Sequence, residues 1–375
     1  MTSRIMHSPL ALMEASSPAH FHLALSRNFP CSLAKGLCMV RKEKLNYDST
    51  PLKNAAHQPV MLAEVVDLFS RIETGVIVDA TLGAGGHSFA LLDSAKTSGR
   101  RGLKVLGIDR DATALAIAEG IVSQFKDRYQ LVLGSFVELD EIVASFGLNG
   151  QIGGVLMDLG VSSMQLDNPL RGFSYRNDGP LDMRMDTSKD ASAYEIINTY
   201  SAERLEEIIR TYGDEKYSRR IANAIVSARP VGSTVELAEI VKNAIPAATR
   251  RHGGHPATRT FQAIRMEVNS EIYSLEKGLK AAIGIINSGG IIAALTYHSG
   301  EDQLVKRVFD QACFGGCTCP VDLPCVCGAV KNFEHVTPRR GLRPSLEEVN
   351  RNHRSASCRL RAIRKKETSD GNDSV

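Results

Sequence analysis

The stretch at residues 76–87 constrains the fold of this chain more than any other. It opens with three apolar, β-branched residues, reaches Asp79, and then crosses Gly83, Gly85 and Gly86. The apolar run predicts a buried strand, and an apolar-periodic helix follows the glycines. Glycines let the backbone approach a ligand closely, and the N-terminus of a helix offers N–H groups. The pattern therefore predicts the nucleotide-binding turn of an α/β sheet.

The next predicted strand, residues 103–109, ends in Asp109, roughly two dozen residues after the glycines. An acid at this place can accept both hydroxyl groups of a ribose. Dinucleotide-binding enzymes share this layout, but Ser88 stands where their third glycine belongs. The loop therefore fits an S-adenosyl-methionine site better. A dinucleotide site and a tight turn without a ligand remain as alternatives.

Strands and helices alternate along the next part of the chain with short connections. Residues 131–133 and 154–158 are predicted to be further strands. Such alternation predicts a parallel, doubly wound sheet, in which ligands bind at the carboxyl ends of the strands. Phe136, after the third strand, either stacks on an adenine or packs in the core. Four residues at these strand ends are expected to converge: Asp79, Asp109, Phe136 and Asp158.

A helical insertion is expected before the next strand, at residues 291–297. More than a hundred residues separate it from the fourth strand, whereas a βαβ crossover needs about 30. Periodicity and stop signals predict helices at residues 202–212, 215–228, 234–244 and 259–285. The last of them returns the chain to the sheet. Three basic residues share a face of the second helix, which either is solvated or contacts a phosphate backbone: Lys216, Arg219 and Arg220.

Composition narrows the classes of function. A net charge of +3 is too small to argue by itself for a nucleic-acid partner, so any basic surface must be local. No apolar run approaches the ~20 residues that cross a bilayer, which predicts a soluble protein with no membrane partner. The uneven spread of the cysteines does not suggest a disulfide framework and favours a reducing compartment. Four of them form two Cys-x-Cys pairs, which either bind zinc or stay as reduced thiols: Cys317, Cys319, Cys325 and Cys327.

The two ends of the chain lack a clear fold pattern. Residues 1–54 are expected to be a disordered extension, either an organellar transit peptide or an upstream segment without a structural role. Residues 313–375 are expected to hold the cysteine segment and a strongly basic tail, which contacts RNA or is solvated. Between these ends we expect a core at residues 55–163 and 255–312, with a helical domain inserted at residues 164–254.

The motifs, taken together, resemble one known family. The matching strings include Asp79-Ala-Thr-Leu-Gly-Ala-Gly-Gly-His87, Met157-Asp-Leu-Gly-Val-Ser-Ser163, Asp178-Gly-Pro-Leu-Asp-Met-Arg-Met-Asp186 and His255-Pro-Ala-Thr-Arg-Thr-Phe-Gln262. With shorter strings between residues 57 and 363, they make the chain similar to the RsmH (MraW) family. The resemblance implies a doubly wound, Rossmann-like class I methyltransferase core with an inserted helical domain. It also implies S-adenosyl-L-methionine as the donor and the N4 amine of one cytidine in small-subunit ribosomal RNA as the acceptor.

The resemblance also implies donor-binding positions. They fall on Gly85, Gly86, His87, Asp109, Phe136, Asp158 and Gln165. Gln165 comes from the resemblance alone. The implied partner is small-subunit rRNA or an assembling 30S-type subunit, in the cytoplasm of a bacterium. If residues 1–50 are a transit peptide, an organellar matrix is the alternative. The oligomeric state stays open, with a homodimer as one option.

Methylation of a cytosine amine requires an acceptor for one of its N–H protons. Asp158, or a backbone carbonyl of the turn after it, lies at the expected place, with Ser162, Ser163 and His298 as weaker candidates. The base must also leave its stack. Four arginines either hold the phosphates of the flipped nucleotide or pair with nearby acids: Arg171, Arg176, Arg184 and Arg259. Two other functions remain as alternatives: a methyltransferase on another nucleic acid or a protein, and a ribosome-assembly factor that binds the donor without turnover.

Overall fold

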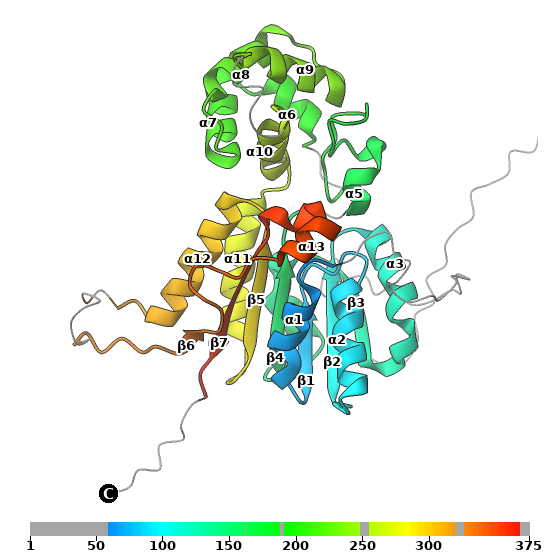
Figure 1. Ribbon diagram of the computed structural model, residues 1–375, viewed down its shortest axis with the longest axis vertical. Coiled ribbons are helices and arrows are strands. Elements are labelled where there is room, and N and C mark those ends of the chain that lie inside the picture. Colours follow the sequence, from blue (N-terminus) through cyan, green and yellow to red (C-terminus); the bar gives the residue numbers. More distant parts are fainter. Residues whose placement is uncertain are drawn as a thin grey trace, which may run out of the picture.

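The structure is a computed structural model with two parts, a lower one built on a β-sheet and an upper one made of helices (Figure 1). It describes residues 59–161, 163–187, 191–247, 255–317, 319 and 326–367. The expected extension at residues 1–54 lies outside the described residues, as does Cys325. Within the described ranges, no helix combines the length and the apolar character that crossing a membrane requires.

Seven strands form one sheet in the lower part. Five are parallel: β1 (Gly75–Asp79), β2 (Leu103–Asp109), β3 (Tyr129–Leu133), β4 (Ile152–Asp158) and β5 (Ile291–Thr296). At one edge, β7 (Arg359–Lys365) pairs antiparallel with β5 and with β6 (Phe333–His335), which gives the order β3-β2-β1-β4-β5-β7-β6. The order reverses between β1 and β4, and ligands of such sheets bind beside this reversal. The predicted doubly wound core is confirmed.

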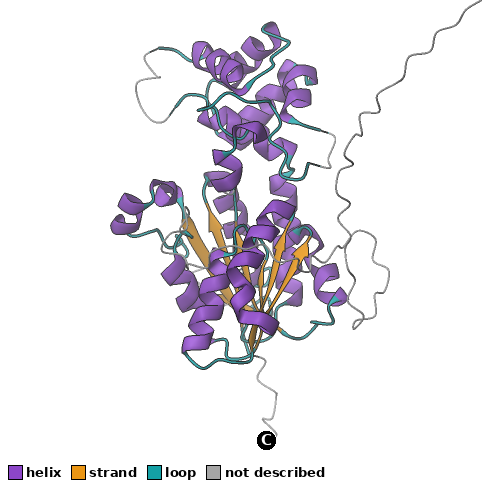
Figure 2. Cartoon of the chain, turned by 90° about the vertical axis from the view of Figure 1, so that its right-hand side faces the viewer, coloured by secondary structure: helices purple, strands orange, loops and turns teal. Residues whose placement is uncertain are grey.

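Helices cover both faces of this sheet (Figure 2). In β1, Val76 and Val78 belong to the apolar cluster on one face, and Ile77 belongs to the cluster on the other. The helices on the first face are α4 (Leu139–Ser145), α11 (Glu271–Ile285) and α12 (Ser299–Phe314). Those on the second are α1 (Leu62–Leu68), α2 (Gly86–Thr97) and α3 (Ala112–Val122). A strand buried on both faces needs apolar residues at successive positions, which explains the run that opened the sequence.

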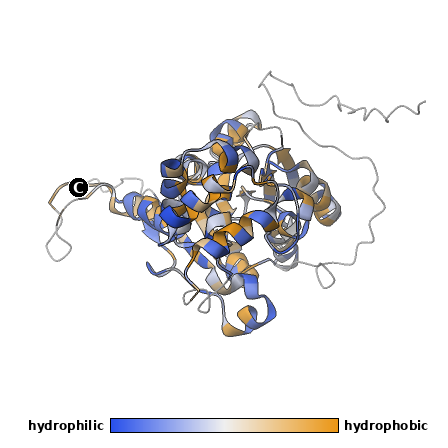
Figure 3. Cartoon of the chain, turned by 90° about the horizontal axis from the view of Figure 1, so that it is seen from above, coloured by the Kyte–Doolittle hydropathy of each residue, from blue (hydrophilic) through white to orange (hydrophobic). Residues whose placement is uncertain are grey.

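The upper part is a helical unit with its own apolar core. Its helices are α5 (Ser163–Asp167), α6 (Ala193–Thr199), α7 (Ala202–Gly213), α8 (Ser218–Ser227), α9 (Thr234–Ala244) and α10 (Thr258–Val268). Helices α7, α8 and α9 were predicted, with α8 beginning three residues later than expected. Their apolar faces meet around Ile208, Ile225 and Leu237. Seen from above, hydrophobic and hydrophilic residues alternate along the helices (Figure 3).

The long helix expected at residues 259–285 is two helices. The break lies between α10 and α11, where Ser270 has a left-handed φ of 49°. The side chain of Asn269 donates to the carbonyl oxygen of Met183 and accepts the N–H of Met185, each at 2.8 Å. These bonds hold the break against the loop near Met183, and α10 lies in the helical unit, where it contacts α7. Within the expected core segment at residues 255–312, α10 thus packs in the helical unit, whereas α11, β5 and α12 pack in the sheet part.

The basic segment near the C-terminus, expected as an RNA-contacting or solvated tail at the end of residues 313–375, is partly a strand of the sheet. β7 buries Leu360 and Ala362 at alternate positions. Between them, Arg361 reaches Asp302 of α12, with Nε 2.7 Å from Oδ1. Residues 360–363 are all buried, and the ion pair of Arg361 explains how a basic residue lies among them.

Candidate functional site

The candidate site lies at the carboxyl ends of β1, β2 and β4, beside the reversal of strand order (Figure 1). The loop after β1 contains Gly83 and Gly85, with left-handed φ values of 52° and 80° that favour glycine. A Cβ added to Gly85 would lie 3.0 Å from Cβ of Ala118, and one added to Gly86 would lie 2.4 Å from Cγ of Pro59. At Gly83 the nearest atom would be 4.0 Å away. The loop is therefore packed tightly on two sides and open at Gly83.

Asp109 is held by this glycine loop and by the end of its own strand. Its Oδ2 accepts the N–H of Gly83 at 2.8 Å, and its Oδ1 accepts that of Asp111 at 2.9 Å. A carboxylate offers about four lone-pair positions, so each oxygen can accept one more donor. Burial raises the pKa of Asp109, although the two backbone hydrogen bonds oppose this effect. The carboxylate is fixed in an orientation that suits two adjacent hydroxyl donors.

Asp79, at the end of β1, is 1% exposed. Its Oδ2 accepts the hydroxyl of Ser88 at 2.7 Å, but its buried Oδ1 has no hydrogen-bond partner among the described residues. Burial raises the pKa of Asp79. A buried oxygen without a donor is costly, and a ligand with a cationic N–H group would satisfy it. This oxygen and the open side of Gly83 fit a nucleoside that carries an amino-acid chain, which is the chemistry of S-adenosyl-methionine.

Asp158, at the end of β4, contacts three neighbouring side chains. Its N–H donates to Oγ1 of Thr81 at 2.6 Å, and its Oδ1 accepts the hydroxyl of Tyr297 at 2.8 Å. Its Oδ2 lies 3.7 Å from Nδ1 of His87. Burial raises the pKa of Asp158, while His87 and the hydrogen bond from Tyr297 act in the opposite direction. The carboxylate is therefore both oriented and made more basic than one in water.

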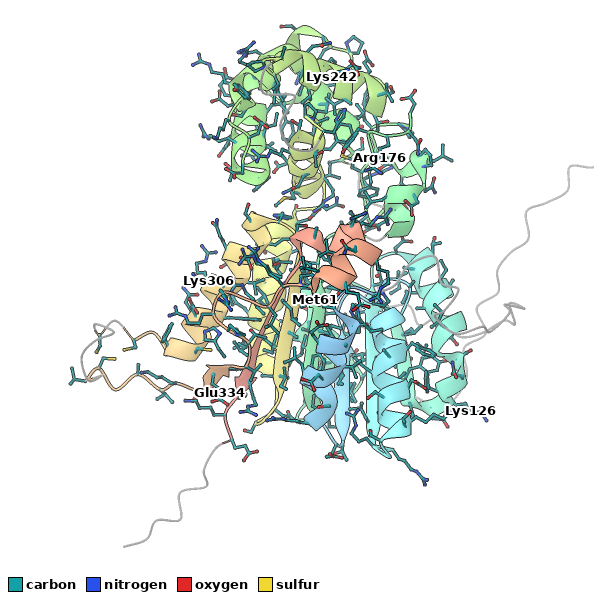
Figure 4. All side chains as sticks on the ribbon, viewed as in Figure 1. Met61, Lys126, Arg176, Lys242, Lys306 and Glu334 are labelled. Atoms are coloured by element: carbon teal, nitrogen blue, oxygen red, sulfur yellow. The ribbon has the colours of Figure 1, made fainter. Side chains whose placement is uncertain are left out.

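His87 connects the site to the segment that precedes α1. It is 6% exposed, and its Nε2 lies 3.1 Å from the carbonyl oxygen of Val60. Because a carbonyl oxygen only accepts, Nε2 carries a proton, and Nδ1 is the nitrogen that can gain or lose one. Met61 follows Val60 in the chain and is buried (Figure 4). Its N–H donates to Oε1 of Glu348 in α13 (Leu346–Arg351) at 2.7 Å. The C-terminal segment thus helps to hold His87 in place.

Phe136 lies after β3 and is half-buried. Its ring packs against α11 so closely that a Cβ added to Gly278 would lie 2.5 Å from a ring carbon. The guanidinium of Arg110, next to Asp109 in the chain, lies 5.5 Å from the centroid of the ring. The ring therefore packs on the core and also lies beside the loop that holds Asp109. Stacking on an adenine stays a prediction.

A polar network joins the site to the helical unit. Asp111 caps α3 by accepting the N–H of Thr113 at 3.0 Å, and its Oδ2 accepts Nη1 of Arg171 at 3.1 Å. The buried Gln165 of α5 also donates to this carboxylate. Burial alone would raise the pKa of Asp111, but these hydrogen bonds, Arg171 first, hold it below its ordinary value. Gln165 is therefore positioned beside the loop that carries Asp109.

The other arginines singled out in the sequence differ in their partners. Arg184 pairs with Asp182, with Nε 2.7 Å from Oδ1, which is the structural role expected as one alternative. Arg176 is exposed on the helical unit (Figure 4). Arg259 is exposed and donates to a backbone carbonyl oxygen in the connection between α7 and α8. Arg171 instead reaches an acid of the sheet part, a partner that the sequence did not predict.

His298 caps α12, where its Nδ1 accepts the N–H of Glu301 at 3.3 Å and its Nε2 lies 3.0 Å from Oε1 of the same residue. These contacts are structural. Sequence reasoning missed Tyr297 and Thr81. Both carry a hydroxyl and follow strands, and ligands of such sheets bind at the carboxyl ends of the strands. The side chains of the two remaining candidates lie outside the described residues: Ser162 and Ser163.

These residues therefore form one site at the strand ends. It offers an acceptor for ribose hydroxyls, a buried carboxylate oxygen for a cationic amine, and a second carboxylate that is oriented and basic. A glycine loop allows a ligand to approach the backbone between them. Such a site can bind a charged nucleoside and can take a proton from a substrate placed against Asp158.

Comparison with known proteins adds a family match. Residues 54–366 match the model of the MraW methylase family. The match covers the sheet, the helical unit, the cysteine segment and β7. It therefore includes residues 313–366, which the predicted domain boundaries had set apart from the core.

Relatives from several bacteria share more than two-fifths of their residues with the chain. Ribosomal RNA small subunit methyltransferase H of Carboxydothermus hydrogenoformans is 46% identical over 314 residues, which are 83% of this chain and 98% of that protein. The protein of the same name from Symbiobacterium thermophilum is 44% identical over 311 residues, 82% of this chain and 96% of that protein. The one from Oleidesulfovibrio alaskensis is 46% identical over 323 residues, 84% and 97% of the two chains.

Proposed function

The chain belongs to the MraW methylase family, and from this membership we propose that it methylates the N4 amine of a cytidine in small-subunit ribosomal RNA. It is an S-adenosyl-methionine-dependent methyltransferase. One observation carries the proposal: the family match runs through both the sheet and the helical unit. The relatives that the chain resembles over nearly their whole length are named for activity on small-subunit rRNA.

We assign the donor to the site at the strand ends. When bound there, it supplies an electrophilic methyl group on a sulfonium. Asp109 would accept the ribose hydroxyls, and Oδ1 of Asp79 would accept the amine of the amino-acid chain. The glycine loop would let the ligand approach the backbone. The remaining positions of the proposed donor site are Gly85, Gly86, His87, Phe136, Asp158 and Gln165.

Asp158 is the residue we propose to take the proton from N4. The lone pair of this amine is delocalised into the cytosine ring, so it becomes available as an N–H proton is drawn away. As the new N–C bond forms and the C–S bond breaks, Oδ2 accepts that proton, while Tyr297 holds Oδ1. The pKa of Asp158, raised by burial, makes the carboxylate a stronger base. Nδ1 of His87, 3.7 Å away, is the next group that could accept the proton.

The helical unit is the part we propose to hold the RNA. It exposes a set of basic side chains that phosphates can contact: Arg176, Lys216, Arg219, Arg220 and Arg259. Such contacts position the strand, while the pocket reads the flipped base. The substrate is then rRNA or the assembling small subunit, and the bacterial cytoplasm, where these subunits assemble, is the proposed compartment.

Methyl transfer to purified substrate tests this function. Small subunits from a strain that lacks the gene are incubated with the full chain and S-adenosyl-methionine, and the rRNA nucleosides are separated by mass spectrometry. We expect N4-methylcytidine to appear, and Asp158→Asn to slow its formation by about 10²–10⁴-fold, the usual contribution of a general base. Asp140→Asn, an exposed acid of α4, is the matched control and should act like the wild type.

Two results would contradict the proposal. A methyl group on a different nucleoside would show that the substrate was assigned wrongly. Donor binding by calorimetry without any transfer to rRNA, subunits or protein would favour an assembly factor that has lost turnover.

A further inference from the structure

The described residues between α12 and β6, 315–317, 319 and 326–332, lie beyond the edge of the sheet, away from the donor site (Figure 1). The sequence of this segment left two alternatives, a zinc site or reduced thiols. We propose that Cys317, Cys319 and Cys327 bind one zinc ion. The three Sγ atoms lie within 4.8 Å of one another. Thiolates on a tetrahedral zinc ion, each at about 2.3 Å from the metal, are separated by about 3.8 Å, so small movements of the side chains close the site.

The backbone brings the two cysteine-bearing arms together. Gly315 ends α12 with a φ of 60° and lies so close to the returning arm that a Cβ there would be 2.1 Å from the carbonyl oxygen of Val330. The N–H of Cys317 donates to the carbonyl oxygen of Phe314 at 3.0 Å, which turns the first arm directly after the helix. Gly328, with a φ of 68°, turns the second arm directly after Cys327. The three cysteines thus lie just beyond the point where Gly315 and Val330 bring the two arms into contact.

The chemistry of the cluster favours zinc. Three thiolates are soft ligands, which select zinc over magnesium or calcium. Cys317 and Cys319 are half-buried and Cys327 is exposed, so an ion can enter from solvent. Three thiolates supply three of the four ligands of a tetrahedral zinc ion, and one further donor would complete the closed coordination that structural zinc has.

The segment also needs a substitute for a hydrophobic core. Val326 and Val330 are 88% and 69% exposed, so these apolar residues of the second arm contribute little burial. A bound metal can supply the stabilisation that burial does not, as it does in small metal-stabilised domains. The inferred site is therefore structural, and it would hold the connection between α12 and β6 in one conformation.

Metal analysis of the full-length protein tests this inference. The protein is purified without chelator, loaded with one equivalent of zinc, and passed over a desalting column, and zinc is measured by mass spectrometry. We expect about one zinc per chain and a loss of most of it in Cys317→Ser and Cys327→Ser. Cys313→Ala, at a buried cysteine of α12 outside the cluster, is the matched control and should keep its zinc.

A second measurement tests the zinc site in the wild-type protein, without any substitution. Wild-type protein loaded with cobalt(II) in place of zinc should show a thiolate-to-cobalt charge-transfer band in its absorption spectrum. Added zinc should displace the cobalt and remove this band. Wild-type protein that retains no zinc and shows no such band would overturn the inference. Retention of full zinc by the Cys317→Ser, Cys327→Ser double variant would overturn it as well. Donor affinity measured by calorimetry reports whether each variant remains folded.

Discussion

The site at the strand ends and the helical unit are built by different kinds of contact. At the strand ends, hydrogen bonds join residues far apart in the chain, such as Asp158 with Thr81 and with Tyr297. In the helical unit, many of the described polar contacts are local, although others, such as the one between Asn269 and Met183, join distant segments. Among the local ones, Ser233 caps α9 through the N–H of Glu236. The strand ends therefore depend on the whole sheet, whereas the helices depend on a separate apolar core.

This difference suggests a division of labour. The buried acids of the site are fixed before a ligand arrives, which is what alignment of a methyl donor requires. The helical unit can vary its surface without disturbing them. The two are connected by the ion pair between Asp111 and Arg171, which links the loop after β2 to the segment after α5. Four variants test whether the two regions behave in this separate but connected way.

The largest effect is expected at Asp109. Asp109→Ala removes the ribose acceptor and also frees the N–H groups of Gly83 and Asp111. Two hydrogen bonds to a charged group contribute about 1.5–3 kcal/mol each, so the affinity for S-adenosyl-methionine should fall by about two orders of magnitude or more. Calorimetry measures this loss, with Asp140→Ala as the exposed control. Unchanged affinity in Asp109→Ala would refute the assignment of the site.

The separate core of the helical unit is tested by Leu237→Ala. Leu237 is fully buried in the apolar cluster of that unit. The free energy of unfolding should fall by about 2–5 kcal/mol, as denaturant titration would measure. Donor affinity at a temperature where the variant is folded should stay within about twofold. Leu346→Ala, at a residue that is 84% exposed, should change neither quantity. Loss of donor affinity in Leu237→Ala would show that the two regions are not separate.

The connection between the regions is tested by Arg171→Met, which keeps an unbranched aliphatic stem and removes the guanidinium group with its charge. The lost hydrogen bonds to Asp111 and to two backbone carbonyl oxygens predict a loss of about 10–100-fold in kcat/KM for the RNA substrate. Donor affinity should fall much less. Arg176→Met removes an exposed arginine of the same segment and tests whether the effect comes from charge alone. An equal loss in both variants would contradict a specific role for the ion pair.

The smallest effect is expected from Tyr297→Phe. The hydroxyl of Tyr297 donates to Oδ1 of Asp158, which favours the ionised carboxylate and lowers its pKa against the effect of burial. Without it the pKa of Asp158 rises, so the carboxylate loses its proton only at a higher pH. The acidic limb of the pH–rate profile should therefore move to higher pH, and the rate at neutral pH should fall by about tenfold, the lower end for one hydrogen bond to a charged group. A shift toward lower pH would contradict the role of Asp158 as the base.

The strand ends could be predicted because their signals are local. Apolar runs that stop at Asp79, Asp109 and Asp158 mark buried strands, and parallel strands bring their ends to one edge. The partners of these acids could not be predicted, because Tyr297 lies 139 residues after Asp158. β7 was missed for a different reason. Its arginines pair with acids on other elements, and only the fold shows that they are not solvated.

The helix break at Asn269 also could not be predicted from the sequence. The apolar period continues through α10 and α11, so periodicity predicts one helix. The side chain of Asn269 instead bonds to the loop near Met183, a contact across 86 positions. Local capping signals behaved differently: Ser233 with Glu236 predicted the start of α9 correctly. Structural features that depend on residues close in the chain could thus be predicted, and those that depend on distant partners could not.

The most direct test of the account is a crystal structure of the full chain with S-adenosyl-homocysteine. The account predicts both ribose hydroxyls within hydrogen-bond distance of the carboxylate of Asp109, and the amine within reach of Oδ1 of Asp79. A ligand bound elsewhere, or one whose ribose faces away from Asp109, would contradict it.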